Sequence, residues 1–201
     1  MRKYVFIALL AVFGLTFALL AVQDISLSNV GRADTTDTAP VGQITLAAGS
    51  EAAFSYLSAQ RTNICGLQPE MVFDYSDDAR LQGSCCSPMD LHRYQEQVEG
   101  LRPYADIPQI PEDPYDMPAA LVKELLGYQA SIQLTPQQQA VYDEAMTLSE
   151  EGGPCCCRCW RWYAFEGMGK YLITQQGWEA EALAALWSLT DGCGGEGHSH
   201  A

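Results

Sequence analysis

Four cysteines fall within five residues of this chain, in the run Pro154-Cys155-Cys156-Cys157-Arg158-Cys159. A proline ahead of an apolar, aromatic stretch predicts that the run forms the first turn of a helix. A helix start leaves backbone N–H groups without partners and carries the positive end of the helix dipole, and both favour thiolate over thiol. Clustered thiolates bind soft metals or exchange disulfides, and they fill a hydrophobic core poorly. The run therefore indicates thiol or metal chemistry.

Helical spacing makes the four thiols unequal. Cys155 and Cys159 would lie one turn apart, as would Cys156 and Cys159, so that these three share a face while Cys157 points elsewhere. Three thiolates on one face suit Cu(I) or Hg(II), and one more imidazole or thiol makes a tetrahedral zinc site. We therefore expect Cys155, Cys156 and Cys159 to be the primary metal ligands.

A second group of soft ligands lies earlier, in Ser84-Cys85-Cys86-Ser87-Pro88-Met89-Asp90-Leu91-His92. Two thiols precede a predicted helix start, and Met89 and His92 share a face on its first turns. Taken singly, Met89 is more simply core filler and His92 a surface histidine, but the adjacent cysteines strengthen the case for metal. If helix packing brings the two starts together, Cys85, Cys86 and His92 would complete one or more sites.

The amino terminus predicts export. Met1-Arg2-Lys3 is positively charged, and Tyr4 to Val22 is an apolar run without a charged residue. A helix of this length would span about 28 Å, close to the hydrocarbon thickness of a bilayer. We therefore expect residues 1–22 to be a transmembrane signal anchor, with a cleaved signal peptide as the alternative. Residues 23–48 form a polar linker in this interpretation, and residues 49–201 a cysteine-rich domain outside the cytoplasm.

The negative charge of the chain limits the classes of partner that it can bind. The chain has 25 acidic and 11 basic residues and a formal net charge of −14. Nucleic acids and anionic lipid surfaces bind clustered Lys and Arg, so the sequence argues against both as partners. The expected partners are a metal ion and, through the N-terminal helix, the membrane, while no protein partner is indicated.

The domain is predicted to be all-α, a small domain of five or six helices behind the N-terminal anchor helix. Prolines, N-cap residues and apolar spacing mark the expected helix starts. These starts lie at Ser50, Pro88, Asp116, Thr135-Pro136, Pro154 and Trp178. Residues 61–83 and the proline-rich residues 102–115 are expected to be irregular, and no alternating pattern predicts a strand.

Two alternatives to a metal site stay open. Eight cysteines in an exported domain normally suggest disulfides, with Cys65, Cys85 or Cys193 as partners of the run. Adjacent cysteines weaken that interpretation, because neighbours on a helix point in different directions. Cys156 to Cys159 is also a C-x-x-C motif, as in disulfide oxidoreductases, but no βαβ pattern accompanies it. A binding role is therefore favoured over an enzyme.

The cysteine run resembles the motif of the bacterial PCYCGC-motif family, which comprises exported proteins of unassigned biochemical function. The proline and the cysteines at 155, 157 and 159 match, whereas Cys156 replaces a tyrosine and Arg158 a glycine. The helix around Tyr142 to Ala145, which ends in a glycine-rich turn, is also similar to what precedes that motif. Family members commonly have a histidine and another cysteine soon after, but here Trp160-Arg161-Trp162-Tyr163 follows. The resemblance implies export and cysteine-based metal handling.

Together these patterns predict an extracytoplasmic, membrane-tethered protein that binds a soft transition metal for sequestration, sensing or delivery. Copper as Cu(I) is expected first, and zinc or mercury next. The predicted ligands are Cys155, Cys156, Cys159, Cys157, Cys85, Cys86 and His92.

Overall fold

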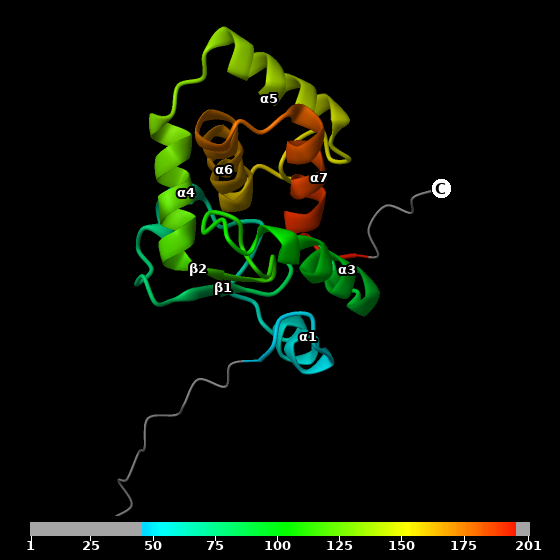
Figure 1. Ribbon diagram of the computed structural model, residues 1–201. Coiled ribbons are helices and arrows are strands. Elements are labelled where there is room, and N and C mark those ends of the chain that lie inside the picture. The colour runs from blue at the N-terminus through cyan, green and yellow to red at the C-terminus, as the bar shows by residue number, and fades with distance from the viewer. Residues whose placement is uncertain (1–45, 196–201) are drawn as a thin grey trace, which may run out of the picture. The chain divides into compact units, whose positions relative to one another are not determined.

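The structure is a computed structural model that describes residues 46–195. The expected anchor at 1–22 and nearly all of the linker at 23–48 lie outside the described residues. Within residues 46–195, no helix is both long enough and apolar enough to cross a membrane. The elements in chain order are α1 (Glu51–Ser58), α2 (Pro69–Val72), β1 (Arg80–Gln82), α3 (Leu91–Leu101), the 3₁₀ helix η1 (Arg102–Tyr104), β2 (Asp116–Pro118), α4 (Ala119–Ser131), α5 (Pro136–Leu148), α6 (Trp160–Gln176) and α7 (Ala180–Thr190) (Figure 1). The prediction of a mostly helical domain is confirmed, with seven α-helices in the described part rather than five or six.

Cap residues place several helix starts as predicted. The Ser50 hydroxyl accepts a hydrogen bond from the Ala53 amide at 3.1 Å and so begins α1. Thr135 and Gln138 form a reciprocal capping box at the start of α5, with bonds of 3.0 and 3.3 Å. Helix α3 begins later than expected, because Asp90 and not Ser87 is its N-cap.

Two short strands were not predicted. β1 and β2 pair antiparallel, with Leu81 opposite Met117 at the centre and both side chains fully buried. Strands of three residues are too short to show an alternating pattern in the sequence. Their pairing joins the segment before the Cys85-Cys86 pair to the start of α4.

The start of α6 corrects the prediction for the cysteine run. The helix begins at Trp160, so Cys155 to Cys157 lie in turns ahead of it, and Cys159 is the N-cap. The Trp160 amide donates to the Leu67 carbonyl at 3.0 Å, and its indole N–H donates to the Asn63 side chain at 3.0 Å. The buried tryptophan therefore fixes where the helix starts, and the argument from helical spacing does not apply to the four cysteines.

Helix α6 is the centre of the domain. It packs against α4, while α5 contacts both α6 and α7 (Figure 1). Its fully buried side chains include Trp160, Phe165, Met168 and Leu172, so apolar residues surround the helix instead of following one stripe. A helix buried in this way holds its N-terminus firmly, and that end carries the cysteine run.

Candidate metal centre

All eight cysteines of the chain gather at one place. All lie within residues 46–195, and none of them is disulfide-bonded. They come from four segments: one cysteine between α1 and α2, two between β1 and α3, four ahead of α6, and one after α7. We call this set the thiol cluster; its members are Cys65, Cys85, Cys86, Cys155, Cys156, Cys157, Cys159 and Cys193.

Sulfur contacts connect the four segments. The Sγ atom of Cys86 lies 2.8 Å from that of Cys65 and 3.7 Å from that of Cys156. The Sγ atom of Cys193 lies 3.1 Å from that of Cys156 and 3.3 Å from that of Cys155. Each segment therefore touches another through sulfur.

The remaining three cysteines join the same network. The Cys85 sulfur is 3.7 Å from Cys193, and the Cys157 sulfur is 3.8 Å from Cys65. Contacts of 3.8 Å or less thus link seven sulfurs into one continuous network. Cys159 is buried at its inner edge, where its thiol interacts with those of Cys155 and Cys85.

The sulfur spacing fits metal ligation. A metal bound at about 2.3 Å by tetrahedral thiolates separates the sulfurs by about 3.8 Å, whereas a disulfide has a bond of about 2.05 Å. The contacts at 3.7 and 3.8 Å match the first distance without any movement. The closer contacts, of which Cys65–Cys86 at 2.8 Å is the shortest, would have to open by up to about 1 Å to reach it.

Four groups of ligand atoms in the cluster lie within 4.8 Å of one another, and they share members. The groups are Cys65–Cys85–Cys86–Cys157, Cys86–Cys156–Cys193, Cys155–Cys156–Cys157 and Cys155–Asp191–Cys193. Because Cys86, Cys155, Cys156, Cys157 and Cys193 each belong to two groups, their sulfurs could bridge neighbouring ions. The arrangement can therefore hold one metal or several.

A backbone ladder fixes part of this cluster without metal. The amides of Cys86 and Ser87 both donate to the Cys193 carbonyl, at 3.1 and 2.8 Å, and the Gly195 amide donates to the Pro88 carbonyl at 2.8 Å. Gly194 has φ of +82°, and a Cβ there would lie 2.1 Å from the Ser87 carbonyl oxygen. Only glycine allows the two segments to come this close.

Burial divides the thiols into an inner and an outer set. Cys155, Cys159 and Cys193 are buried, with exposed fractions of 0, 1 and 6%. Cys65, Cys86 and Cys156 are exposed, and Cys85 and Cys157 are half-buried. The cluster therefore reaches from the core beside α6 to the surface.

A buried arginine lies beside the inner thiols. The Arg161 side chain is fully buried on the first turn of α6, and its Nη1 donates to the Thr190 carbonyl at 3.2 Å. Its Nε and Nη2 atoms have no hydrogen-bond partner among the described residues. A buried cation needs compensating negative charge. The arginine therefore suits a cluster of thiolates better than one of neutral thiols.

Electrostatics link Arg161 to the thiol cluster. Burial lowers the pKa of Arg161, but Cys85, Cys155 and Cys193, when they are ionised as metal-bound thiolates would be, outweigh burial and raise it. Sequence reasoning did not single out Arg161. Its position between two buried tryptophans was the only signal, and an arginine next to aromatic residues is common in exposed helices too.

Hydrogen bonds set unequal proton affinities in the cluster. Those from Cys155 and Cys85, and then from the Arg161 amide, lower the pKa of Cys159 to about 2. The bond with Cys159 in turn raises the pKa of Cys85 and of Cys155. Without metal, one thiolate is surrounded by neutral thiols, so further metal binding has to displace protons.

The structure brings six of the seven predicted ligands together, and His92 is the exception. Its imidazole is exposed on α3 and lies 3.1 Å from the Glu96 carboxylate. Met89 is buried in the core between α1 and α3, as core filler would be. Cys65 and Cys193 were left open between a place at the site and a disulfide and were not among the predicted ligands, but both belong to the cluster.

Comparison with known proteins gives no relative for this chain. No family model, curated protein or solved structure matches it. The resemblance to the PCYCGC-motif family therefore stays a prediction from the motif, and the site has to be interpreted from its own chemistry.

Proposed function

We propose that this protein binds several soft metal ions in one thiolate-bridged cluster, with Cu(I) as the preferred ion. The observation that carries the proposal is the convergence of all eight cysteines, from four segments, into one network without a disulfide. Thiolates are the preferred ligands of Cu(I), zinc and mercury. The unbonded donors of Arg161 support a cluster with net negative charge.

The shape of the ligand groups favours Cu(I). Apart from the carboxylate of Asp191, the members of the four groups are all sulfurs, and two of the groups offer three sulfurs each. Zinc takes four ligands in structural sites, so eight thiols in separate sites would bind two zinc ions. Cu(I) accepts fewer sulfurs, and shared sulfurs allow more than two ions. Zinc and Hg(II) are the next candidates.

The two other functions fit the cluster less well. A disulfide-stapled module needs four bridges, and the described residues contain none. A disulfide oxidoreductase needs Cys156 and Cys159 as an isolated pair. Instead, the Cys156 sulfur lies 3.1 Å from that of Cys193 and 3.7 Å from that of Cys86, and neither ligand group that contains Cys156 includes Cys159. We place the cluster outside the cytoplasm, tethered through residues 1–22, on the basis of the sequence pattern.

The test is a Cu(I) titration of the full chain, purified in detergent without oxygen or metal, against a chromophoric Cu(I) chelator. We expect more than two Cu(I) ions per chain to be retained. Cys86→Ser and Cys193→Ser should lower this number, because each of these two sulfurs contacts three others. His92→Asn is the matched control and should leave it unchanged. Eight free thiols that retain no Cu(I) or zinc, or eight bridged ones, would exclude the proposal.

A further inference from the structure

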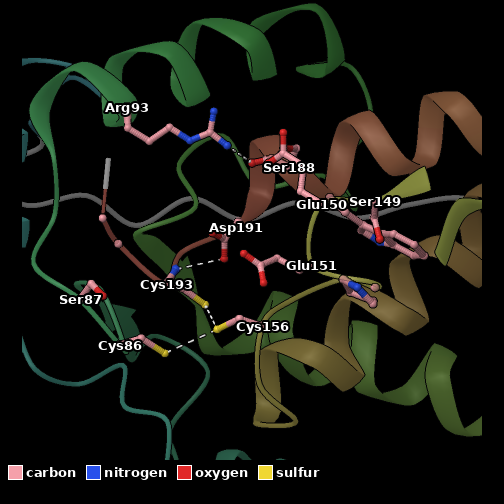
Figure 2. Close-up of a pocket in the computed structure, with 15 residues that line it drawn as sticks. Cys86, Ser87, Arg93, Ser149, Glu150, Glu151, Cys156, Ser188, Asp191 and Cys193 are labelled. Atoms are coloured by element: carbon pink, nitrogen blue, oxygen red, sulfur yellow. Dashed lines mark hydrogen bonds between the residues drawn. The ribbon is translucent and has the colours of Figure 1, made fainter. Parts of the chain in front are cut away.

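A pocket of about 260 Å³ opens beside the thiol cluster. Cys86, Cys156 and Cys193 line it with their sulfurs next to one another, and Asp191 and Glu151 lie beside them (Figure 2). The Asp191 carboxylate accepts a hydrogen bond from the Cys193 amide at 3.2 Å. Drug-sized ligand sites measure roughly 300–1,000 Å³. At about 260 Å³ this pocket lies just below that range, so it is suited to a ligand smaller than a drug-sized molecule.

The three sulfurs make an incomplete coordination shell. Cys156 lies 3.7 Å from Cys86 and 3.1 Å from Cys193, and all three ligand atoms lie within 4.8 Å of one another. The pocket leaves one side of this group open, whereas the Cys65–Cys85–Cys86–Cys157 group supplies four sulfurs. Sites with three protein ligands and an open position exchange their fourth ligand, in contrast to closed structural sites.

Charge around the pocket is mostly negative. Asp191, Glu150 and Glu151 line it, and Arg93 is the one basic side chain among the lining residues. The Arg93 guanidinium already donates to the Ser188 carbonyl at 2.8 Å and lies 3.9 Å from the Glu96 carboxylate. A cationic or neutral ligand is therefore favoured over an anionic one.

We propose that this pocket is an exchange port, where a small thiol of neutral or positive charge delivers and removes Cu(I). This inference rests on the proposed function, because it names the carrier of the ions that the thiol cluster binds. The carrier brings Cu(I) bound to its own sulfur. A new bond forms between Cu(I) and Sγ of Cys156, the bond to the carrier sulfur breaks, and the Cys156 proton passes to the departing carrier thiolate. No oxidation state changes.

The test compares carriers of different charge. Cu(I) is delivered to the full chain, without oxygen and at low ionic strength, as its complex with cysteamine, mercaptoethanol or mercaptopropionate, and the transfer rate is measured by stopped flow. We expect cysteamine to be fastest and mercaptopropionate slowest. The double variant Glu150→Gln/Glu151→Gln removes two negative charges from the lining of the pocket. The cysteamine rate should then fall and the mercaptopropionate rate rise, each about fivefold for two charges that act across about 8 Å of water. The ratio of the two rates should fall about 25-fold.

Two further variants separate the port from general effects. Asp143→Asn/Glu144→Gln removes two exposed carboxylates from α5 that do not line the pocket, and it should leave the rate ratio within about twofold of the wild type. Ser87→Trp, at the exposed edge of the pocket, should slow transfer from all three carriers at least about fivefold, in line with steric blocking. The number of Cu(I) ions bound is measured for the same variant, because the Ser87 amide belongs to the backbone ladder.

The outcomes distinguish this inference from the proposed function. A chain that retains no Cu(I) in the chelator titration contradicts the proposed function itself. A chain that retains Cu(I), but whose transfer rates do not respond to carrier charge, to the Glu150/Glu151 change or to Ser87→Trp, contradicts only the exchange port.

Discussion

Replacing Arg161 by methionine should weaken Cu(I) binding without destabilising the metal-free protein. Arg161 is fully buried, and its guanidinium lies over the rings of Trp160 and Phe165, with distances of 4.8 and 5.3 Å to their centroids. Methionine keeps most of the volume and the apolar contacts. It removes the charge and the two donors that have no partner among the described residues.

The magnitude follows from those two donors. In the metal-loaded protein we expect Nε and Nη2 to donate to cluster thiolates, and hydrogen bonds to a charged group contribute about 1.5–3 kcal/mol each. Loss of two such bonds, at the lower value, costs about 3 kcal/mol, or about 150-fold in affinity. In the metal-free protein the same donors are unbonded. Exchanging a buried ion for an apolar side chain is then often neutral or stabilising.

Two measurements check this prediction. Chelator competition gives the Cu(I) affinity, and urea unfolding of the metal-free protein gives the free energy of unfolding. We expect the affinity of Arg161→Met to fall about 100-fold and the free energy of unfolding to stay the same or rise. Arg158→Met is the matched control, because Arg158 is exposed and its guanidinium lies 4.2 Å from the Trp162 centroid. Equal affinity losses in both variants, or a large loss of metal-free stability with unchanged affinity, would refute the reasoning.

Three further predictions concern stability and pH. Gly167→Ala should lower the free energy of unfolding by about 3 kcal/mol, because the new Cβ would lie 1.9 Å from the Leu125 carbonyl oxygen where α4 crosses α6. Gly127→Ala is the control: the space around it is open, so alanine should stabilise α4 by up to about 1 kcal/mol. Burial raises the pKa of Asp113 above 3.8, so its contribution to stability is complete below pH 3.8 and is lost as the pH rises through the native pKa. Asp113→Asn should remove this part of the pH dependence of the free energy of unfolding, measured from pH 3 upward. Burial, followed by the bond with Cys65, raises the pKa of Cys86 to about 12, so Cu(I) affinity in chelator competition should increase with pH as protons become easier to displace. Flat affinity across the neutral range would contradict the last prediction.

Local signals in the sequence predicted the helices well. Ser50 and the Thr135-Pro136 pair begin helices as expected, because a cap acts on the amides directly after it. The start of α6 was predicted six residues too early, at Pro154 instead of Trp160. Tertiary contacts decided that start, since the Trp160 amide bonds to the distant Leu67 carbonyl. Rules for helix caps consider only residues near the helix start, so they could not predict a contact with Leu67.

The sequence predicted the chemistry of the candidate site, but only some of the residues that form it. Adjacent cysteines indicated soft-metal chemistry, and the convergence of Cys85-Cys86 with the run at Cys155 was expected from packing alone. Cys65 and Cys193 were not among the predicted ligands, because their neighbours in the sequence do not distinguish a metal ligand from a disulfide partner. His92 was predicted from its helical spacing to Met89, but α3 begins at Leu91, so Met89 lies ahead of the helix. Its thioether is buried, whereas the His92 imidazole is exposed.

The backbone ladder between Ser87 and Cys193 has a consequence for how the protein could tell one metal from another. Backbone hydrogen bonds hold the Cys86 and Cys193 segments side by side without any ion, so little conformational entropy is lost when an ion binds. Ions then compete on bond strength and preferred geometry, and not on how well each one induces folding. Far-ultraviolet circular dichroism of the empty and loaded protein should accordingly coincide, even for ions whose affinities differ by many orders of magnitude.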